Sequence, residues 1–210
     1  MTRGRFISFE GGEGGGKSTQ ARRLAERLSA VISEVVVTRE PGGSPGAEVI
    51  RGLLVNGEVD RWSAVTETLL MYAARRDHIE RVIRPALDAG GWVLSDRFAD
   101  STRAYQGAGG GAPQELIVAL EQHVVGETMP DLTLILDLPV ELGLGRAAQR
   151  GGAEARFEAK DIAFHERLRE RFLAIARMEP ERCAVIDAAL APDAVAEAIW
   201  TVVEDRLKPA

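Results

Sequence analysis

A glycine-rich stretch near the N-terminus has the residue types and the spacing of a phosphate-binding loop. It matches the pattern G-x-x-x-x-G-K-[ST] with the residues Gly11, Gly12, Glu13, Gly14, Gly15, Gly16, Lys17 and Ser18. Glycines let successive backbone N–H groups turn toward a phosphate, and a helix that begins at the loop adds the positive end of its dipole. Lys17 is therefore expected to reach the β- and γ-phosphates of ATP, and the Ser18 hydroxyl to ligate Mg²⁺.

The loop alone predicts a bound nucleoside triphosphate and leaves the class of protein open. A glycine-rich strand-to-helix turn that binds no ligand is the alternative. The sequence has neither an N-K-x-D guanine-reading motif nor a β-run that ends in an Asp–Glu pair. These absences disfavour GTPases and motor ATPases, and kinases remain.

A carboxylate and a guanidinium, Asp96 and Arg97, stand together at the end of the apolar run 92–96. In an open parallel sheet, ligands bind at the carboxyl ends of the strands. Asp96 is expected to hold Mg²⁺ or its waters, and Arg97 to clamp a phosphate with its fork of donors. A local ion pair that caps the strand is the alternative. Asp137, at the end of the run 132–137, is a competing metal ligand, but it has no arginine beside it.

Short β-rich runs alternate with longer segments of helical period, and this pattern places the two motifs at one edge of a sheet. Strands are predicted at 6–10, 34–39, 92–96, 132–137 and 184–187. Helices are predicted at about 17–31, 47–54, 65–89, 113–125, 140–149, 160–178 and 192–207. Glycine clusters predict loops at 11–16, 42–46, 107–111 and 151–152. The expected fold is α/β, a P-loop NTPase-like open parallel five-stranded sheet with helices on both faces.

Bulk composition limits the partners and the compartment. A chain of 210 residues, 45% hydrophobic and 28% charged, fits one domain over 1–210. The net charge of -6 argues against a nucleic-acid partner. Cys183 is the only cysteine, which excludes an intramolecular disulfide, and no signal-peptide or bilayer-length apolar run is present, so we expect no membrane partner and a cytoplasmic location. The histidines His78, His123 and His165 lack metal-ligand spacing and are expected at the surface or between helices.

The sequence resembles the thymidylate kinases of the bacterial type over nearly its whole length. The resemblance is carried by FEGGE at 9–13, TREPGG at 38–43, YAAR at 72–75, DRF at 96–98, AYQG at 104–107, PDLT at 130–133 and the arginine-rich stretch 146–156. It implies transfer of the γ-phosphoryl group of ATP to dTMP, with Mg²⁺, giving dTDP and ADP in dTTP synthesis. It also implies a homodimer.

For the acceptor, the resemblance implies that Glu13 receives the sugar 3′-hydroxyl and that Arg75 reads the thymine O4. The chemistry agrees, because a carboxylate accepts a hydroxyl donor, and an arginine has only donors to offer a carbonyl. Arg75 is thereby expected to reject the exocyclic amine of cytosine. A salt bridge of Arg75 with Asp77 or with a neighbouring helix is the alternative.

The other acceptor residues that the resemblance implies are Glu40, Arg51, Met71, Arg97, Thr102, Tyr105 and Gln106. Thr102 and Gln106 contact the base, Tyr105 crowds the 2′ position, and Arg51 holds the phosphate region together with Arg97. Met71 is a departure, since the family usually has Phe there. Thymine stacking is expected to be weaker, or to be taken over in part by a neighbour such as Tyr72.

The stretch at about 146–158 resembles a mobile lid whose arginines neutralise the phosphoryl group in transfer. The resemblance assigns Arg146 and Thr19 to ATP binding, and Arg150 and Arg156 to catalysis with Lys17, Asp96 and Arg97. Glu158 matches an acidic lid position and is expected to orient a lid arginine or a metal-bound water. An arginine-rich, solvated helix end is the alternative.

Two other functions stay open at this point. One is a kinase for another pyrimidine nucleotide or for a deoxynucleoside, which a pocket altered at Met71 would favour. The other is a nucleotide-binding regulator that has kept the fold and lost the transfer reaction. The presence of Lys17, Asp96 and Arg97 argues against the regulator.

Overall fold

A five-stranded, wholly parallel sheet forms the centre of the computed structural model, which describes residues 3–58, 61–150 and 160–209. The strands are β1 (Phe6–Glu10), β2 (Val35–Arg39), β3 (Trp92–Asp96), β4 (Leu132–Asp137) and β5 (Cys183–Asp187). They lie in the order β2-β3-β1-β4-β5, so β1 is central. The predicted fold class and all five predicted strands are confirmed to within one residue at each end.

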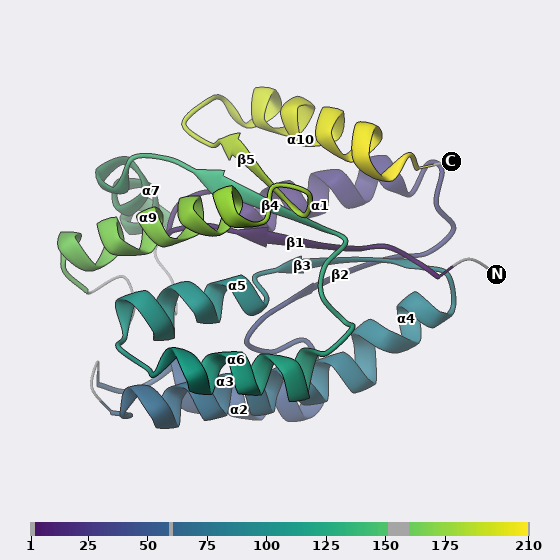
Figure 1. Cartoon of the computed structure of the whole chain (residues 1–210). Helices are drawn as coiled ribbons and strands as arrows, with labels where there is room; N and C mark the ends of the chain where they lie inside the picture. Colours follow the sequence, from purple (N-terminus) through teal and green to yellow (C-terminus); the bar gives the residue numbers. More distant parts are fainter. Residues whose placement is uncertain (1–2, 59–60, 151–159, 210) are drawn as a thin grey trace.

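Helices cover both faces of the sheet (Figure 1). Helices α1 (Lys17–Leu28) and α10 (Pro192–Leu207) pack on one face, where Leu24 and Ile199 join Phe9 in one core cluster. The other face carries α2 (Pro45–Val55), α3 (Ala64–His78), α4 (Arg84–Asp88) and α6 (Gln114–Leu120). At the edge, α7 (Val140–Arg150) and α9 (Ile162–Met178) follow β4, and Phe172 of α9 packs with Tyr105 and Ile135.

The predicted helix 65–89 is one continuous run with a wide π turn, η1 (Ile79–Ile83), between α3 and α4. Ser63 caps its start, because the Ser63 hydroxyl accepts a hydrogen bond from the Thr66 N–H. The wide turn precedes Pro85, which has no N–H for a regular helical hydrogen bond. A similar turn, η3 (Glu121–Val125), continues α6 to the predicted end of that helix.

A helical segment that the sequence did not predict consists of α5 (Ala99–Thr102) and η2 (Arg103–Gly109). Part of this segment was predicted to be a loop because of its cluster of glycines. The reason is that Asp100, Thr102 and Gln106 are buried although they are polar, so the segment lacks the apolar stripe of an ordinary surface helix. The prediction for 151–152 lies outside the described residues. No helix among the described residues is long and apolar enough to cross a membrane.

Candidate active site

The glycine-rich loop connects β1 to α1, as the motif requires. Gly14 has a φ of 69°, and a Cβ built there would lie 2.1 Å from the Gly143 carbonyl oxygen. A side chain at this position would therefore collide with the helix beyond β4. Lys17 lies across the loop, and its Nζ donates to the Gly12 oxygen at 2.7 Å and to the Gly11 oxygen at 3.3 Å. The lysine is thereby held at the mouth of the loop, where a phosphate would bind.

Ser18 and Asp96 come together at the carboxyl edge, because β1 and β3 are neighbours in the sheet. The Ser18 hydroxyl donates to Asp96 Oδ2. A hydroxyl and a carboxylate are the oxygen ligands that Mg²⁺ prefers, with its remaining positions filled by water and substrate phosphates. These two oxygens are side-chain groups at this edge that could hold a magnesium ion together with a nucleotide. The described residues contain no cluster of three or more His, Cys, Asp or Glu side chains suited to a metal.

The competing metal ligand, Asp137, is engaged elsewhere. Its two carboxylate oxygens accept hydrogen bonds of 2.7 and 2.9 Å from Arg169 of α9. This two-pronged ion pair ties α9 to the end of β4. The geometry therefore favours Asp96 over Asp137 as the metal ligand.

Arg97 occupies an unusual backbone conformation, with a φ of 72°. A residue with a side chain rarely adopts this region, and such strain is typical of functional sites. Its guanidinium donates to the Gly11 oxygen at 3.0 Å and to Glu13 Oε1 at 3.0 Å, and it lies 4.8 Å from the ring of Tyr105. Arg97 thus joins the phosphate loop to the segment that holds Tyr105.

Glu13 is buried inside the loop and is strongly acidic. Burial acts to raise the pKa of Glu13, but Arg97, Lys17 and a hydrogen bond from the Tyr105 hydroxyl together lower it to about 2. The Tyr105 hydroxyl donates to Glu13 Oε1 at 2.6 Å. Glu13 is therefore an ionised hydrogen-bond acceptor at any physiological pH.

This shift predicts a pH-dependent stability that a Glu13→Gln variant lacks. Because the folded-state pKa falls from 4.5 to about 2, the contribution of Glu13 is fully present above pH 4.5 and is lost as the pH falls through 2. It corresponds to about 3 kcal/mol. Urea unfolding of both proteins from pH 5 to about 2 measures it. We expect the wild type to lose that much stability relative to the variant, and parallel curves would contradict the assignment.

A cavity of about 480 Å³, including space open to solvent, lies beside the loop. It is lined by Glu13, Glu40, Pro41, Val55, Met71, Arg75, Arg97, Phe98, Ser101, Thr102, Tyr105 and Gln106. All of the predicted acceptor residues except Arg51 are among them. We call this space the acceptor cavity.

A larger cavity of about 930 Å³, which we call the phosphate cavity, surrounds the loop. It is lined by Gly14, Gly15, Gly16, Lys17, Ser18, Thr19, Arg22, Arg39, Arg51 and Asp96, and it shares Glu13, Glu40 and Arg97 with the acceptor cavity. Arg51 thus lies at the phosphate cavity, where its Nη1 donates to the Pro41 oxygen at 2.7 Å. The sequence analysis missed Arg22 and Arg39, although Arg39 ends β2 at this same edge.

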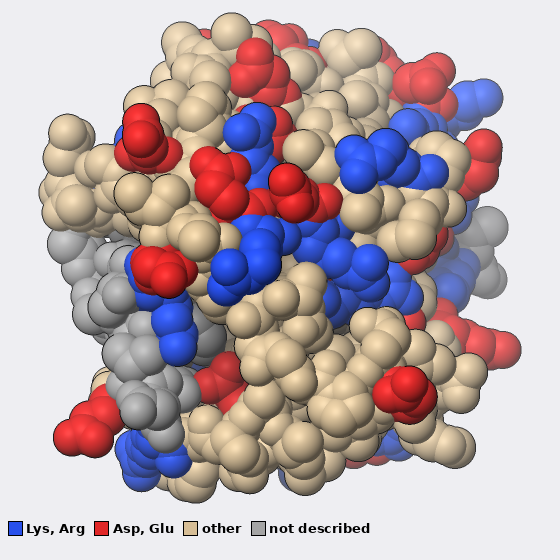
Figure 2. All heavy atoms as spheres, turned by 60° about the vertical axis from the view of Figure 1, so that its left-hand side comes forward, with Lys and Arg blue, Asp and Glu red and all other residues tan. Residues whose placement is uncertain are grey.

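The carboxyl edge of the sheet lies at the left of Figure 1 and comes forward in Figure 2. On that face, Lys and Arg side chains gather with Asp and Glu side chains near the middle of the molecule. The phosphate cavity itself is lined by side chains of both signs of charge, on a chain whose net charge is -6.

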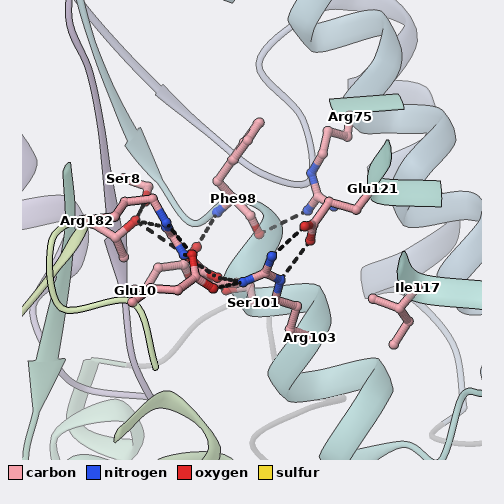
Figure 3. A network of polar contacts seen from close by, with 12 residues as sticks. Ser8, Glu10, Arg75, Phe98, Ser101, Arg103, Ile117, Glu121 and Arg182 are labelled. Atoms are coloured by element: carbon pink, nitrogen blue, oxygen red, sulfur yellow. Dashed lines mark hydrogen bonds and ion pairs between the residues drawn. The ribbon is translucent and has the colours of Figure 1, made fainter. Parts of the chain in front are cut away.

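Arg75 is buried at the wall of the acceptor cavity and is only 2% exposed. Its Nε donates to Glu40 at 2.7 Å, and its Nη2 donates to the Phe98 oxygen and to Thr102 Oγ1, both at 3.0 Å (Figure 3 shows the contact with Phe98). Its Nη1 is buried and has no hydrogen-bond partner among the described residues. One donor nitrogen of a fixed guanidinium is thus left for a ligand.

Arg75 forms an ion pair, as the alternative expected, but its partner is Glu40 in the loop after β2. Asp77 instead pairs with Arg81 at 2.7 Å, so it is not the partner of Arg75. Glu40 also accepts a hydrogen bond of 2.9 Å from His78. Burial acts to raise the pKa of Glu40, but Arg75 and His78 hold it below its ordinary value. Contrary to the expectation, His78 is neither at the surface nor between helices, because it is fully buried and contacts Thr38 of β2 and Glu40 beyond it.

Met71 lines the acceptor cavity, as the resemblance implied. Tyr72, proposed as a substitute stacking group, faces the core, and its hydroxyl donates to the Ile117 oxygen at 3.4 Å. Phe98 is the aromatic side chain that lines the cavity together with Tyr105. Tyr72 is therefore not placed to stack on a base in this cavity, contrary to the expectation.

A buried ionic network, which the sequence analysis also missed, fixes α5 and η2 against the sheet (Figure 3). Asp100 accepts hydrogen bonds from Arg182, before β5, at 2.7 and 3.1 Å, and from Arg103 at 3.1 Å. Arg103 also pairs with Glu121 of η3. The network anchors the segment that carries four acceptor-cavity residues, Ser101, Thr102, Tyr105 and Gln106.

Glu10 holds the turn that follows β3. Its carboxylate accepts hydrogen bonds from the Phe98 N–H at 2.8 Å and from the Ser101 hydroxyl at 2.5 Å. Burial and the nearby charge of Asp100 raise the pKa of Glu10 to about 7. Since Arg97 lies inside this turn, Glu10 supports its left-handed conformation.

The lid arginines are described only in part. The guanidinium of Arg146, in α7, donates to the Ala188 oxygen at 2.7 Å and to the Ala189 oxygen at 3.2 Å, beyond β5. The backbone of Arg150 ends α7. The side chain of Arg150, together with Arg156 and Glu158, lies outside the described residues.

A phosphate loop beside a second cavity at the carboxyl edge of a parallel sheet defines a nucleoside monophosphate kinase. The sequence model of the family described as thymidylate kinase matches residues 9–199. The chain belongs to the thymidylate kinase family.

Individual thymidylate kinases also resemble this chain over most of its length. The thymidylate kinase of Caulobacter vibrioides is 72% identical over 207 residues, which cover 99% of each chain. That of Nitrobacter winogradskyi is 58% identical over 206 residues, covering 97% of this chain and 90% of the relative. The crystal structure of thymidylate kinase from Ehrlichia chaffeensis is 34% identical and covers 96% of this chain and 99% of its own, with a TM-score of 0.79.

Proposed function

We propose that the protein transfers the γ-phosphoryl group of Mg·ATP to dTMP and so forms dTDP and ADP. The observation that carries this proposal is the buried Nη1 of Arg75, which has no hydrogen-bond partner within the described part of the chain. It lies at the wall of a cavity that meets the phosphate cavity at Glu13, Glu40 and Arg97. A guanidinium fixed on its other nitrogens offers a donor to the thymine O4 and cannot accept from the amine of cytosine. The family membership supports the same substrate.

In this proposal, the two cavities hold the two nucleotides end to end. ATP lies with its phosphates on the loop and Lys17, and dTMP lies in the acceptor cavity with its 3′-hydroxyl on Glu13. Arg97 and Arg51 hold the acceptor phosphate. Because that phosphate is itself the nucleophile, the protein needs to position it and to neutralise charge rather than to remove a proton from carbon or a hydroxyl.

Mg²⁺ fits this proposal through Ser18 and Asp96, and it supplies charge neutralisation on the β- and γ-phosphate oxygens when bound. Lys17 adds a cation that the loop fixes in place through the Gly11 and Gly12 oxygens. Arg150 and Arg156 remain proposed donors from the lid.

Initial rates with a panel of acceptors under saturating Mg·ATP test the proposal. We expect dTMP to give the highest kcat/KM, dUMP to follow, and dCMP and thymidine to be poor acceptors. A preference for dCMP would contradict the role of Arg75 and favour a different pyrimidine nucleotide kinase. ATP binding without ADP formation in the presence of dTMP would favour the regulator.

We also propose that this single kinase domain pairs as a homodimer through α2, α3 and α6, which lie together on one side of the sheet (Figure 1). Apolar residues are exposed on these helices, including Val49 at 71% and Leu69 at 47%. Sedimentation equilibrium is expected to show a dimer that Leu69→Arg converts to a monomer. Leu190 lies in the loop after β5 and is as exposed as Leu69, so Leu190→Arg is the matched control and should stay dimeric. A monomeric wild type would contradict the proposal.

A further inference from the structure

We propose that Glu67 determines the base specificity of the acceptor cavity by fixing the direction of the Gln106 side-chain amide; this inference rests on the proposed function. Gln106 lies in η2, is 1% exposed and lines the acceptor cavity. Its Nε2 donates to Glu67 Oε1 at 2.9 Å.

Glu67 stands at the start of a row of residues on α3. Glu67, Met71 and Arg75 follow each other at intervals of four residues, so they share one face of the helix. Met71 and Arg75 line the acceptor cavity. Glu67 is the next residue of this row toward the start of the helix. Its hydrogen-bond partner, Gln106, belongs to a different segment of the chain.

The chemistry of the two side chains dictates which end of the amide faces Glu67. A carboxylate offers only acceptors, whereas an amide has a donor nitrogen at one end and an acceptor oxygen at the other. The nitrogen of Gln106 must therefore face Glu67. The atom that this amide has left for a ligand in the acceptor cavity is its carbonyl Oε1.

An oxygen at this position distinguishes the pyrimidine bases by their N3 atom. Thymine and uracil carry a hydrogen on N3 and donate it, whereas N3 of cytosine accepts. Arg75 and Gln106 lie close together, because Arg75 Nη2 donates to Thr102 Oγ1, four residues before Gln106. The pair thus presents a donor for O4 and an acceptor for N3–H. A reversed amide would present a donor that suits N3 of cytosine, and Arg75 alone would then oppose the cytosine amine.

The test uses the variant Glu67→Gln, whose amide can accept or donate and so no longer fixes the direction of Gln106. Steady-state kcat/KM is measured for dTMP, dUMP and dCMP at saturating Mg·ATP. We expect kcat/KM for dTMP and dUMP to fall together. The ratio of kcat/KM for dTMP to that for dCMP should fall about tenfold or more, because a Gln106 amide that can turn no longer places its oxygen against N3 of cytosine. The KM for ATP should not change.

A reciprocal exchange provides the rescue. In the double variant Glu67→Gln/Gln106→Glu, the carboxylate at position 106 offers only acceptors to the base. The amide at position 67 donates a hydrogen bond to that carboxylate. The dTMP to dCMP ratio is expected to return to within about threefold of the wild type. A purely structural role for Glu67 would not produce this recovery.

Glu80→Gln is the matched control, because Glu80 follows α3, is exposed and pairs with Arg76. An equal fall of kcat/KM for all three nucleotides in Glu67→Gln, or an unchanged ratio, would overturn the inference. A wild type that phosphorylates none of the three would instead overturn the proposed function. The two failures are therefore distinguishable.

Discussion

Replacement of Lys17 by alanine is expected to lower the rate of phosphoryl transfer by about 10²–10³-fold, the usual effect of removing one preorganised charge from a transferring group. The lysine is 7% exposed, and the Gly11 and Gly12 carbonyl oxygens hold its ammonium group at the loop. Its charge is therefore in place before the reaction begins. No other lysine or arginine lies within the loop sequence itself.

Single-turnover quench-flow with Mg·ATP and dTMP measures this rate apart from product release. Lys208→Ala is the control, since Lys208 is exposed after α10, and its rate should match the wild type. A thermal melt of each variant shows whether the fold is kept. An unchanged transfer rate in Lys17→Ala would contradict the role given to this residue.

Arg75→Ala is expected to lower kcat/KM for dTMP by about 10³-fold, because a site built around a hydrogen bond to its substrate is left with unpaired polar groups. The KM for ATP should stay nearly constant, since Arg75 lines only the acceptor cavity of the two. The variant should also be less stable by about 3–5 kcal/mol, because Glu40 remains buried without its strongest partner.

Arg75→Lys separates the two effects. A lysine keeps a positive charge beside Glu40 but cannot hold Glu40, Thr102 and a base at once, because it lacks the planar fork of arginine. We expect this variant to recover most of the stability and little of the dTMP turnover. If both variants lost affinity for ATP as strongly as they lost dTMP turnover, Arg75 would have only a structural role.

The strands and the phosphate loop were predictable because their signals are local. The strands β1 and β4 are rich in apolar residues and buried over consecutive positions, since both faces of the sheet are covered. The loop between β1 and α1 is marked by its glycines, of which Gly11 and Gly14 leave no room for a side chain. The acceptor assignments for Thr102, Tyr105 and Gln106 came from the family resemblance. Nothing in the local pattern around these residues indicates a binding role.

What the sequence could not predict are contacts between distant segments. Arg75 pairs with Glu40, which is 35 residues away, rather than with its neighbour Asp77. Asp100 meets Arg182 across 82 residues. Segment 99–109 was missed for the same reason, since its buried polar residues are satisfied by partners that only the folded chain brings near.

The most direct measurement supplies the purified protein with magnesium, ATP and dTMP and follows the nucleotides by chromatography. If two nucleotides meet over the glycine loop with Arg75 reading the base, dTDP and ADP should appear in equal amounts, and neither should appear when dTMP is left out. ADP without dTDP, or no product at all, would contradict the account.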